Sequence, residues 1–159
     1  MAKGIYLAQD CHVVNILPPV SVSGGLTAQP FHMRDAGHAS IILQIGASPA
    51  ALTGVTLNAC TNNAGANPTP IPFDLFSQTT SGTANDVLGA LQAEASTGFV
   101  PADAADTFYV IEVDGDSLPE GSPYLQLVIA NGANAVIASA VAILSGLRQA
   151  CESNPTATN

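Results

Sequence analysis

The stretch TFYVIEVDGDSLPEGSPYLQLVI, residues 107–129, gives the clearest indication of the fold class. Two apolar runs rich in Val, Ile, Tyr and Phe flank a segment of Asp, Gly, Ser and Pro, which is typical of two strands joined by a turn. In the first run, Tyr109, Ile111 and Val113 share one face, because successive strand side chains point to opposite faces. The other face starts apolar and ends on Glu112, so we expect a strand that begins buried on both faces and ends in solvent.

The rest of the chain repeats this pattern of short apolar segments bounded by Gly, Pro, Asn and Asp. In HASIILQI, residues 38–45, one face is apolar and the other is mixed. The segment AVIASAVAILSGL, residues 135–147, fits either a helix or a strand buried on both faces, and its Val and Ile content favours the strand. The sequence therefore predicts an all-β sandwich or barrel. About eight strands are expected, at Cys11–Leu17, Leu26–Met33, His38–Ile45, Leu52–Cys60, Ile71–Gln78, Thr107–Asp114, Tyr124–Ala130 and Ala135–Ser145.

The length of 159 residues suits a single domain. We expect an N-terminal arm at 1–10, a β-sandwich domain at 11–150 and a flexible C-terminal tail at 151–159, because the tail is polar and has no apolar anchor. The Ala-, Thr- and Gly-rich segment 80–105 is predicted to be an insertion, either irregular or with one short helix. That helix would span 85–95, with its inward-facing side chains at Val87, Leu88 and Leu91.

The charge balance excludes several classes of partner. The chain has 12 acidic and 3 basic side chains and a formal net charge of -9. Lys3, Arg34 and Arg148 form no basic cluster, so we expect no binding to nucleic acid or to an anionic membrane surface. The longest apolar stretch, 135–147, is too short to cross a bilayer, and the first residues lack a signal-peptide pattern. These features predict synthesis in a cytoplasm.

No residues stand out as a catalytic, cofactor-binding or metal-binding set. In Asp10-Cys11-His12, a strand would place the thiol and the imidazole on opposite faces, so the three cysteines are expected to act as small apolar residues. His32 and His38 flank a turn and would at most supply half of a zinc site. We expect both histidines to be exposed, and we expect no enzymatic activity.

The turn after residue 113 carries Asp114, Asp116 and Glu120 close together. Such a density of carboxylates suits calcium, but the spacing is not that of a helix-loop-helix site, and a solvated turn is expected. The segment 101–159 contains seven acids and one arginine. It predicts an acidic face that points outward into solvent or, as the alternative, complements a basic patch.

The surface composition points to assembly. Charged residues make up only 9% of the chain, and its one lysine, Lys3, cannot protect several sheet edges. Interface centres are depleted in Lys, Glu and Asp, so a sparsely charged β-domain suits a subunit packed among others.

Four segments together resemble the capsid decoration or cement proteins of tailed bacteriophages: HVVNILPPVSVSGG at 12–25, HASIILQIGAS at 38–48, TFYVIEVDGDSLPEGSPYLQLVI at 107–129 and ANAVIASAVAILSGLR at 133–148. The resemblance implies a jelly-roll-like β-sandwich. It also implies a virion protein on the capsid exterior that binds the lattice of the major capsid protein, often as a trimer, and stabilises it without a cofactor.

Under that resemblance, the two terminal arms are expected to order on contact, and Lys3, Tyr6, Arg34 and Arg148 are the predicted partner-binding residues. The alternatives are a neck or tail accessory subunit, and a glycan-binding head fibre or adhesin module. Because the chain has no tryptophan, a glycan site would have to stack sugars on Tyr6, Tyr109 and Tyr124.

Overall fold

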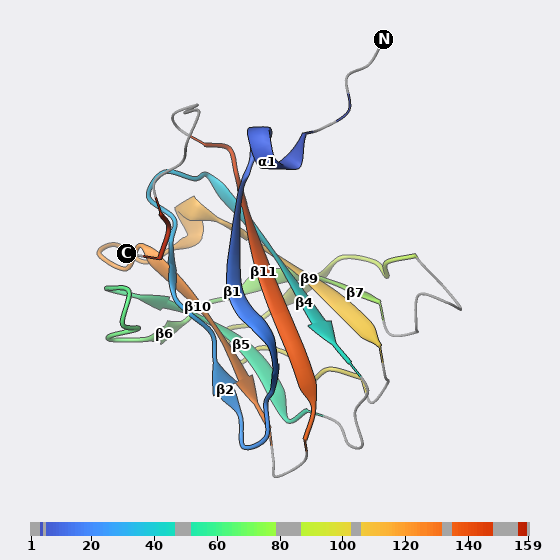
Figure 1. Cartoon of the computed structure of the whole chain (residues 1–159). Helices are drawn as coiled ribbons and strands as arrows, with labels where there is room; N and C mark the ends of the chain where they lie inside the picture. The colour runs from blue at the N-terminus through green and yellow to red at the C-terminus, as the bar shows by residue number, and fades with distance from the viewer. Residues whose placement is uncertain are drawn as a thin grey trace.

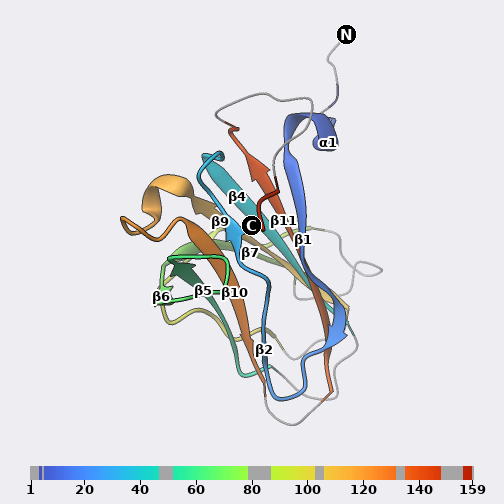
Figure 2. The same ribbon diagram turned by 60° about the vertical axis from the view of Figure 1, so that its left-hand side comes forward.

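The computed structural model describes residues 4, 6–46, 52–78, 87–102, 106–131, 135–147 and 156–158. In these residues two antiparallel sheets pack face to face (Figure 1). In Figure 2, strands β5 and β10 of one sheet lie to the left of β1 and β11 of the other. The elements are α1 (Leu7–Asp10), β1 (His12–Ser21), β2 (Leu26–Thr27), β3 (Phe31–His32), β4 (His38–Ile45), β5 (Gly54–Cys60), β6 (Thr69–Pro70), β7 (Phe73–Gln78), β8 (Gln92–Glu94), β9 (Thr107–Asp114), η1 (Gly115–Ser117), β10 (Tyr124–Ala130) and β11 (Ile137–Ser145).

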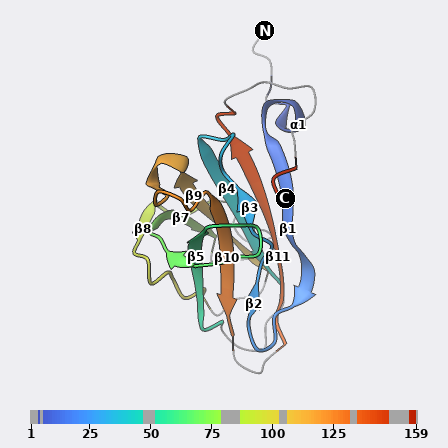
Figure 3. The same ribbon diagram turned by 90° about the vertical axis from the view of Figure 1, so that its left-hand side faces the viewer.

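The strand order is that of a jelly roll. The first sheet runs β1-β11-β4-β9-β7-β8 and the second β2-β10-β5-β6, with β3 also paired to β10. If β2 and β3 count as one broken strand and the β7–β8 hairpin is set aside, the orders become 1-8-3-6 and 2-7-4-5. This is the double Greek-key arrangement of jelly rolls. The β7–β8 hairpin extends the first sheet beyond β9, so Figure 3 places β8 and β1 on opposite sides of the view.

Most of the predicted strands are confirmed. Strands β4, β9 and β10 have the predicted bounds, and β11 confirms the strand interpretation of 135–147. The predicted strand Leu26–Met33 is broken into β2 and β3, with Pro30 between them. Proline lacks a backbone N–H and cannot donate to the sheet, which explains the break.

The predicted helix at 85–95 is wrong within the described residues. Residues 87–91 are not helical, and Gln92–Glu94 form β8 instead, paired with β7. Val87, Leu88 and Leu91 are exposed rather than inward-facing. The helical spacing of three apolar residues was outweighed by pairing with a strand that already belonged to the sheet. Apart from β8 and the bridge of Phe99 to Val55, the described part of this segment is irregular, which was the alternative expectation.

A single apolar core fills the space between the two sheets. Ile111 of β9 is fully buried between its register partners Ile41 of β4 and Leu75 of β7. From the second sheet, Leu57 and Leu127 are register partners and are also fully buried. Burial of this apolar surface is the main force that holds the two sheets together.

The sheet edges are protected without charge. Strand β1 has two register shifts and carries Pro18 and Pro19. The remaining edge strands are two or three residues long, and β6 includes Pro70. Short strands, irregular register and proline all discourage pairing with another chain, so the lack of lysine is compensated at the edges.

Parts of both terminal segments are ordered. The predicted arm 1–10 contains the one-turn helix α1, in which the Tyr6 backbone N–H donates to Asp10 Oδ2 at 3.0 Å. The predicted flexible tail 151–159 is docked at its described part, because Ala157 is buried and its carbonyl accepts from the His32 backbone N–H at 2.7 Å. Residues 151–155 and 159 lie outside the described residues.

Candidate interaction surface

The outer face of the six-stranded sheet carries a continuous apolar row. The register places Val141 of β11, Ile42 of β4, Val110 of β9 and Phe76 of β7 side by side. All four belong to the face opposite the core, since their sequence neighbours Ala142, Ile41, Ile111 and Leu75 are buried. Ile42 keeps 37% of its surface exposed, and the other three are half-buried.

Rows on either side extend this surface. Val13 of β1 is the register partner of Ile143 of β11, and Val13 is 44% exposed. On the other side, Phe108 of β9 pairs with Gln44 of β4. We call this set the apolar band; its members are Val13, Ile42, Phe76, Phe108, Val110, Val141 and Ile143. Within the described strands, the neighbouring charged side chains Glu112 and Asp74 lie at its border. A contiguous exposed apolar patch on a small protein is typical of an interaction site.

The outer face of the second sheet is different. Its side chains include Thr27, Thr56, Asn58 and Gln126, and Gln126 is buried although it points away from the core. The loop after β5 packs over this face so closely that a Cβ on Gly65 would lie 2.7 Å from Gln126 Nε2. The loop thus covers this face at Gln126, whereas Val13 and Ile42 of the apolar band are exposed to solvent.

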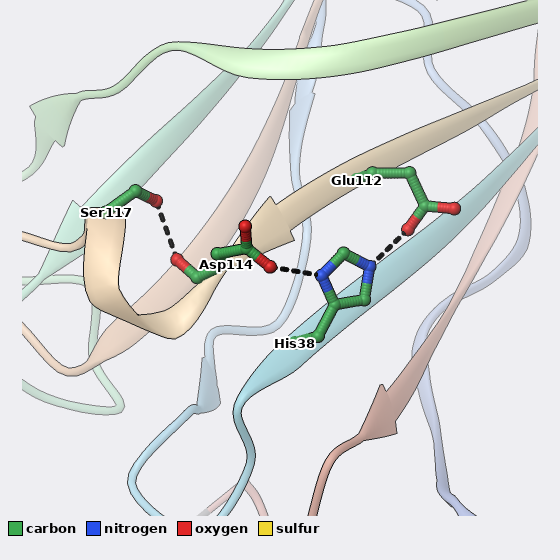
Figure 4. A network of polar contacts seen from close by, with 4 residues as sticks. All are labelled: His38, Glu112, Asp114 and Ser117. Atoms are coloured by element: carbon green, nitrogen blue, oxygen red, sulfur yellow. Dashed lines mark hydrogen bonds and ion pairs between the residues drawn. The ribbon is translucent and has the colours of Figure 1, made fainter.

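A histidine held between two carboxylates lies beside the band (Figure 4). His38 begins β4, and the register places it opposite Asp114 of β9. Its Nδ1 lies 2.7 Å from Asp114 Oδ1, and its Nε2 lies 2.7 Å from Glu112 Oε2. Ser117 Oγ donates to the Asp114 carbonyl at 2.6 Å and fixes the turn that follows. Only the charged imidazolium has an N–H on both nitrogens, so the arrangement suits the protonated ring.

The pKa of His38 reflects opposing effects. Burial by itself lowers this pKa, but the hydrogen bonds that Asp114 and Glu112 accept from the ring, together with their negative charges, outweigh burial, and the net pKa is raised. A histidine whose pKa is raised on folding adds stability that is fully present below its unfolded pKa of about 6.5. That stability is lost as the pH rises through the folded pKa.

We therefore expect His38→Gln to cost more stability at pH 6 than at pH 9. His38 is partly exposed, so the loss should stay below about 1 kcal/mol. Urea unfolding of both proteins across this pH range measures it. Ser40→Ala, a neighbouring change without an ionisable group, should show a difference from wild type that does not vary with pH. A cost of His38→Gln that is constant or grows with pH would contradict this account of the pair.

An acidic cleft adjoins the same end of the apolar band. It has a volume of about 220 Å³ and lies between β7, β8, β9 and η1. Four carboxylates line it: Asp74, Glu94, Glu112 and Asp114. Asp74 and Glu112 are register partners, each two residues from a member of the band on the same strand. Even a protonated His38 would pair with only two of these four groups, so the cleft retains excess negative charge.

The predicted partner-binding residues are not brought together within the described chain. Tyr6 is 64% exposed beside α1, and Arg34 is exposed in the turn between β3 and β4. Lys3 and Arg148 lie outside the described residues. The sequence interpretation missed the apolar band. The sequence signal for the band was the apolar residues on the second face of the strands 107–114 and 135–147. These residues suggested that the second face is buried as well, but their side chains are half-buried at the surface.

The other candidate groups occupy separate places. His32 packs edge-on against Tyr124 with ring centroids 4.8 Å apart, while His38 binds Asp114 and Glu112, so the two histidines do not form a half-site. Both histidines are half-buried, His32 against Tyr124 and His38 between two carboxylates, so the expectation that both are exposed is wrong. Asp116 and Glu120 are exposed in the turn, as a solvated turn requires.

The two described cysteines are free thiols. Cys60 is fully buried, as expected of a small apolar residue, and burial raises the pKa of its thiol. Cys11 is half-buried at the end of α1, and Cys151 lies outside the described residues. Within the described part of the chain, no three His, Cys, Asp or Glu side chains are grouped so that they could hold a metal ion. The helices seen there are too short to cross a membrane.

Comparison with known proteins assigns no family to the chain. No protein-family model matches the sequence, and no curated protein sequence is significantly similar to it. Among solved structures, the chain is similar to the crystal structure of SPBc2 prophage-derived protein YomS. The two share 11% identity, with 84% of this chain and 93% of that chain covered and a TM-score of 0.45. At this level the similarity carries no argument about function, so the function is argued from the chain's own surface.

Proposed function

We propose that this protein is a virion structural protein that docks on the outside of an assembled phage capsid and stabilises it. The observation that carries the proposal is the open apolar band on a jelly roll whose edges are closed by proline, irregular register and short strands. A protein of this kind associates through a face rather than by adding strands. The sparse charge of the whole chain agrees with a subunit role, and no enzymatic activity is part of the proposal.

Stabilisation would follow from selective binding. A subunit that binds the assembled lattice and not the free shell protein shifts the equilibrium toward the lattice by mass action. The proposed form is a homo-oligomer, with a trimer favoured, made in the host bacterial cytoplasm and bound to the major capsid protein. When the copies of one oligomer bind the shell together, their association adds avidity, so each single contact with the shell can be weak.

The second candidate, a glycan-binding head fibre or adhesin module, has less support. A sugar site would rely on exposed aromatic rings, and the chain has no tryptophan. Tyr109 is buried in the core, and Tyr124 packs against His32. Of the three tyrosines, Tyr6 is the one with most of its surface exposed. A neck or tail accessory subunit uses the same surface chemistry and differs in its place in the particle.

The proposal is tested by cosedimentation of the purified protein with DNA-free, expanded capsids of its source particle. Unexpanded shells and free shell subunits serve as controls. We expect saturable binding to expanded capsids at a fixed ratio per shell subunit. An absence of binding to every shell form would reject capsid decoration and leave the neck or tail subunit and the glycan-binding module to be tested.

A further inference from the structure

We infer that the apolar band and the adjoining acidic cleft form one docking surface, and that its occupant is a different protein whose contact surface is an apolar strip flanked by Lys or Arg. This inference rests on the proposed function and deepens it, because it assigns the side of this chain that meets the shell and the chemistry of the shell surface that it meets. Arg34 and the described residues of the predicted arms are not among the residues of this surface.

The first step is that the band is an open apolar surface on the outer face of the six-stranded sheet. The outer face of the second sheet carries Thr27, Thr56, Asn58 and Gln126, and the loop that contains Gly65 covers it at Gln126. By contrast, Val13 and Ile42 keep more than a third of their surface exposed, and their neighbours in the band are half-buried. An apolar surface of this kind gains free energy when a partner removes it from water.

The second step is the size of the surface. The band crosses five neighbouring strands, β1, β11, β4, β9 and β7, and three rows of outward side chains. With strands about 4.8 Å apart and outward residues about 6.6 Å apart, the whole of these rows covers roughly 500 Å², and the seven residues of the band contribute about half of it. Burial of this area on both partners gives about 1,000 Å², the lower limit for a specific interface. The acidic cleft must therefore contribute, and so must repeated contacts across the shell.

The third step is the charge, which selects the occupant. Asp74, Glu94, Glu112 and Asp114 line the cleft at one end of the band. A second copy of this chain would bring three basic and twelve acidic side chains, so it is a poor source of complementary charge. A partner with Lys or Arg beside its apolar strip pairs with these carboxylates, gives the contact its orientation and makes binding sensitive to salt.

The test uses two variants and one control in the cosedimentation experiment with expanded capsids. Ile42→Glu places a charge at the centre of the band, and Asp74→Lys reverses one charge of the cleft. Thr27→Glu adds the same charge as the first variant on the exposed β2 strand of the other sheet. Circular dichroism and thermal melting check that all three remain folded.

We expect Ile42→Glu to weaken binding by at least about tenfold, because it would bury an unpaired carboxylate. Asp74→Lys should weaken binding severalfold and reduce its dependence on salt, while Thr27→Glu stays within about twofold of wild type. If Ile42→Glu binds capsids as well as wild type does, the docking surface is wrong even though decoration stands. If Ile42→Glu instead lowers the mass of the free protein in sedimentation equilibrium, the band is an interface between copies, which also overturns the inference.

A probe without capsids separates this inference from the proposed function. An NMR titration with a short peptide of alternating Lys and Leu, and with a matched peptide of alternating Glu and Leu, tests the surface directly. We expect the Lys peptide to shift the methyl signals of Ile42, Val110 and Val141, and the Glu peptide to leave them unchanged. Equal shifts with both peptides, or none with either, would reject the proposed chemistry of the partner whatever the capsid experiment shows.

Discussion

Gly98→Ala is expected to destabilise the fold by more than about 3 kcal/mol. Gly98 has a φ of +73°, a conformation that disfavours residues with a Cβ, and a Cβ at this position would lie 2.0 Å from the Val55 carbonyl oxygen. That carbonyl accepts from the Phe99 N–H at 3.0 Å, and the Val55 N–H donates back to the Phe99 carbonyl at 2.8 Å. The clash therefore separates β5 from the segment around Phe99, which this isolated bridge holds together. Urea unfolding followed by circular dichroism measures the loss.

Gly121→Ala is the matched control. Gly121 has a similar φ of +79°, but a Cβ there would meet nothing within 4 Å. The loss of stability in Gly121→Ala is limited to the strain of this backbone conformation, about 1–2 kcal/mol. Equal losses for the two variants would show that the close approach to Val55 does not govern the effect.

Ile111→Ala is expected to cost about 2–5 kcal/mol, the range for removal of large aliphatic side chains from a core. Ile111 is fully buried in β9, with Ile41 and Leu75 as its register partners on the two neighbouring strands. Because β9 is hydrogen-bonded to β4 on one side and to β7 on the other, the backbone has little freedom to close around the missing atoms. Chemical unfolding of the variant measures the change.

Val110→Ala changes the residue before Ile111 in β9 and tests the outer face of the strand separately from its core face. Val110 points outward and is half-buried within the apolar band, so its truncation should cost less than about 1.5 kcal/mol. It should weaken capsid binding, whereas Ile111→Ala should leave binding intact under conditions in which the variant is folded. A reversed pattern, with binding lost only in Ile111→Ala, would contradict the assignment of the outer face as the docking surface.

The fold was largely predictable because alternation and turn residues are local signals. HASIILQI gave the bounds of β4, and the turn residues after Asp114 gave the ends of β9 and β10. The order of the strands was not readable from these signals, since pairing such as β4 with β11 joins segments far apart in the chain. Strand β8 was missed for the same reason, because it forms through pairing with β7 and its own residues do not show a strand pattern.

The candidate surface was harder to predict than the core. Val110 and Val141 have the residue types of a buried strand, and the sequence does not say whether a second layer covers them. Only the topology shows that their face is the outer one. The pairing of His38 with Glu112 and Asp114 likewise depends on register between β4 and β9, which brings together residues more than seventy positions apart.

The most direct test of the account is an electron cryomicroscopy reconstruction of expanded capsids saturated with the purified protein. We predict extra density on the outside of the shell, with the six-stranded sheet facing the major capsid protein. Ile42 and Val110 should lie over an apolar strip, and the acidic cleft should lie over basic side chains. A capsid without added density, or density in which this sheet faces solvent and another surface meets the shell, would contradict the account.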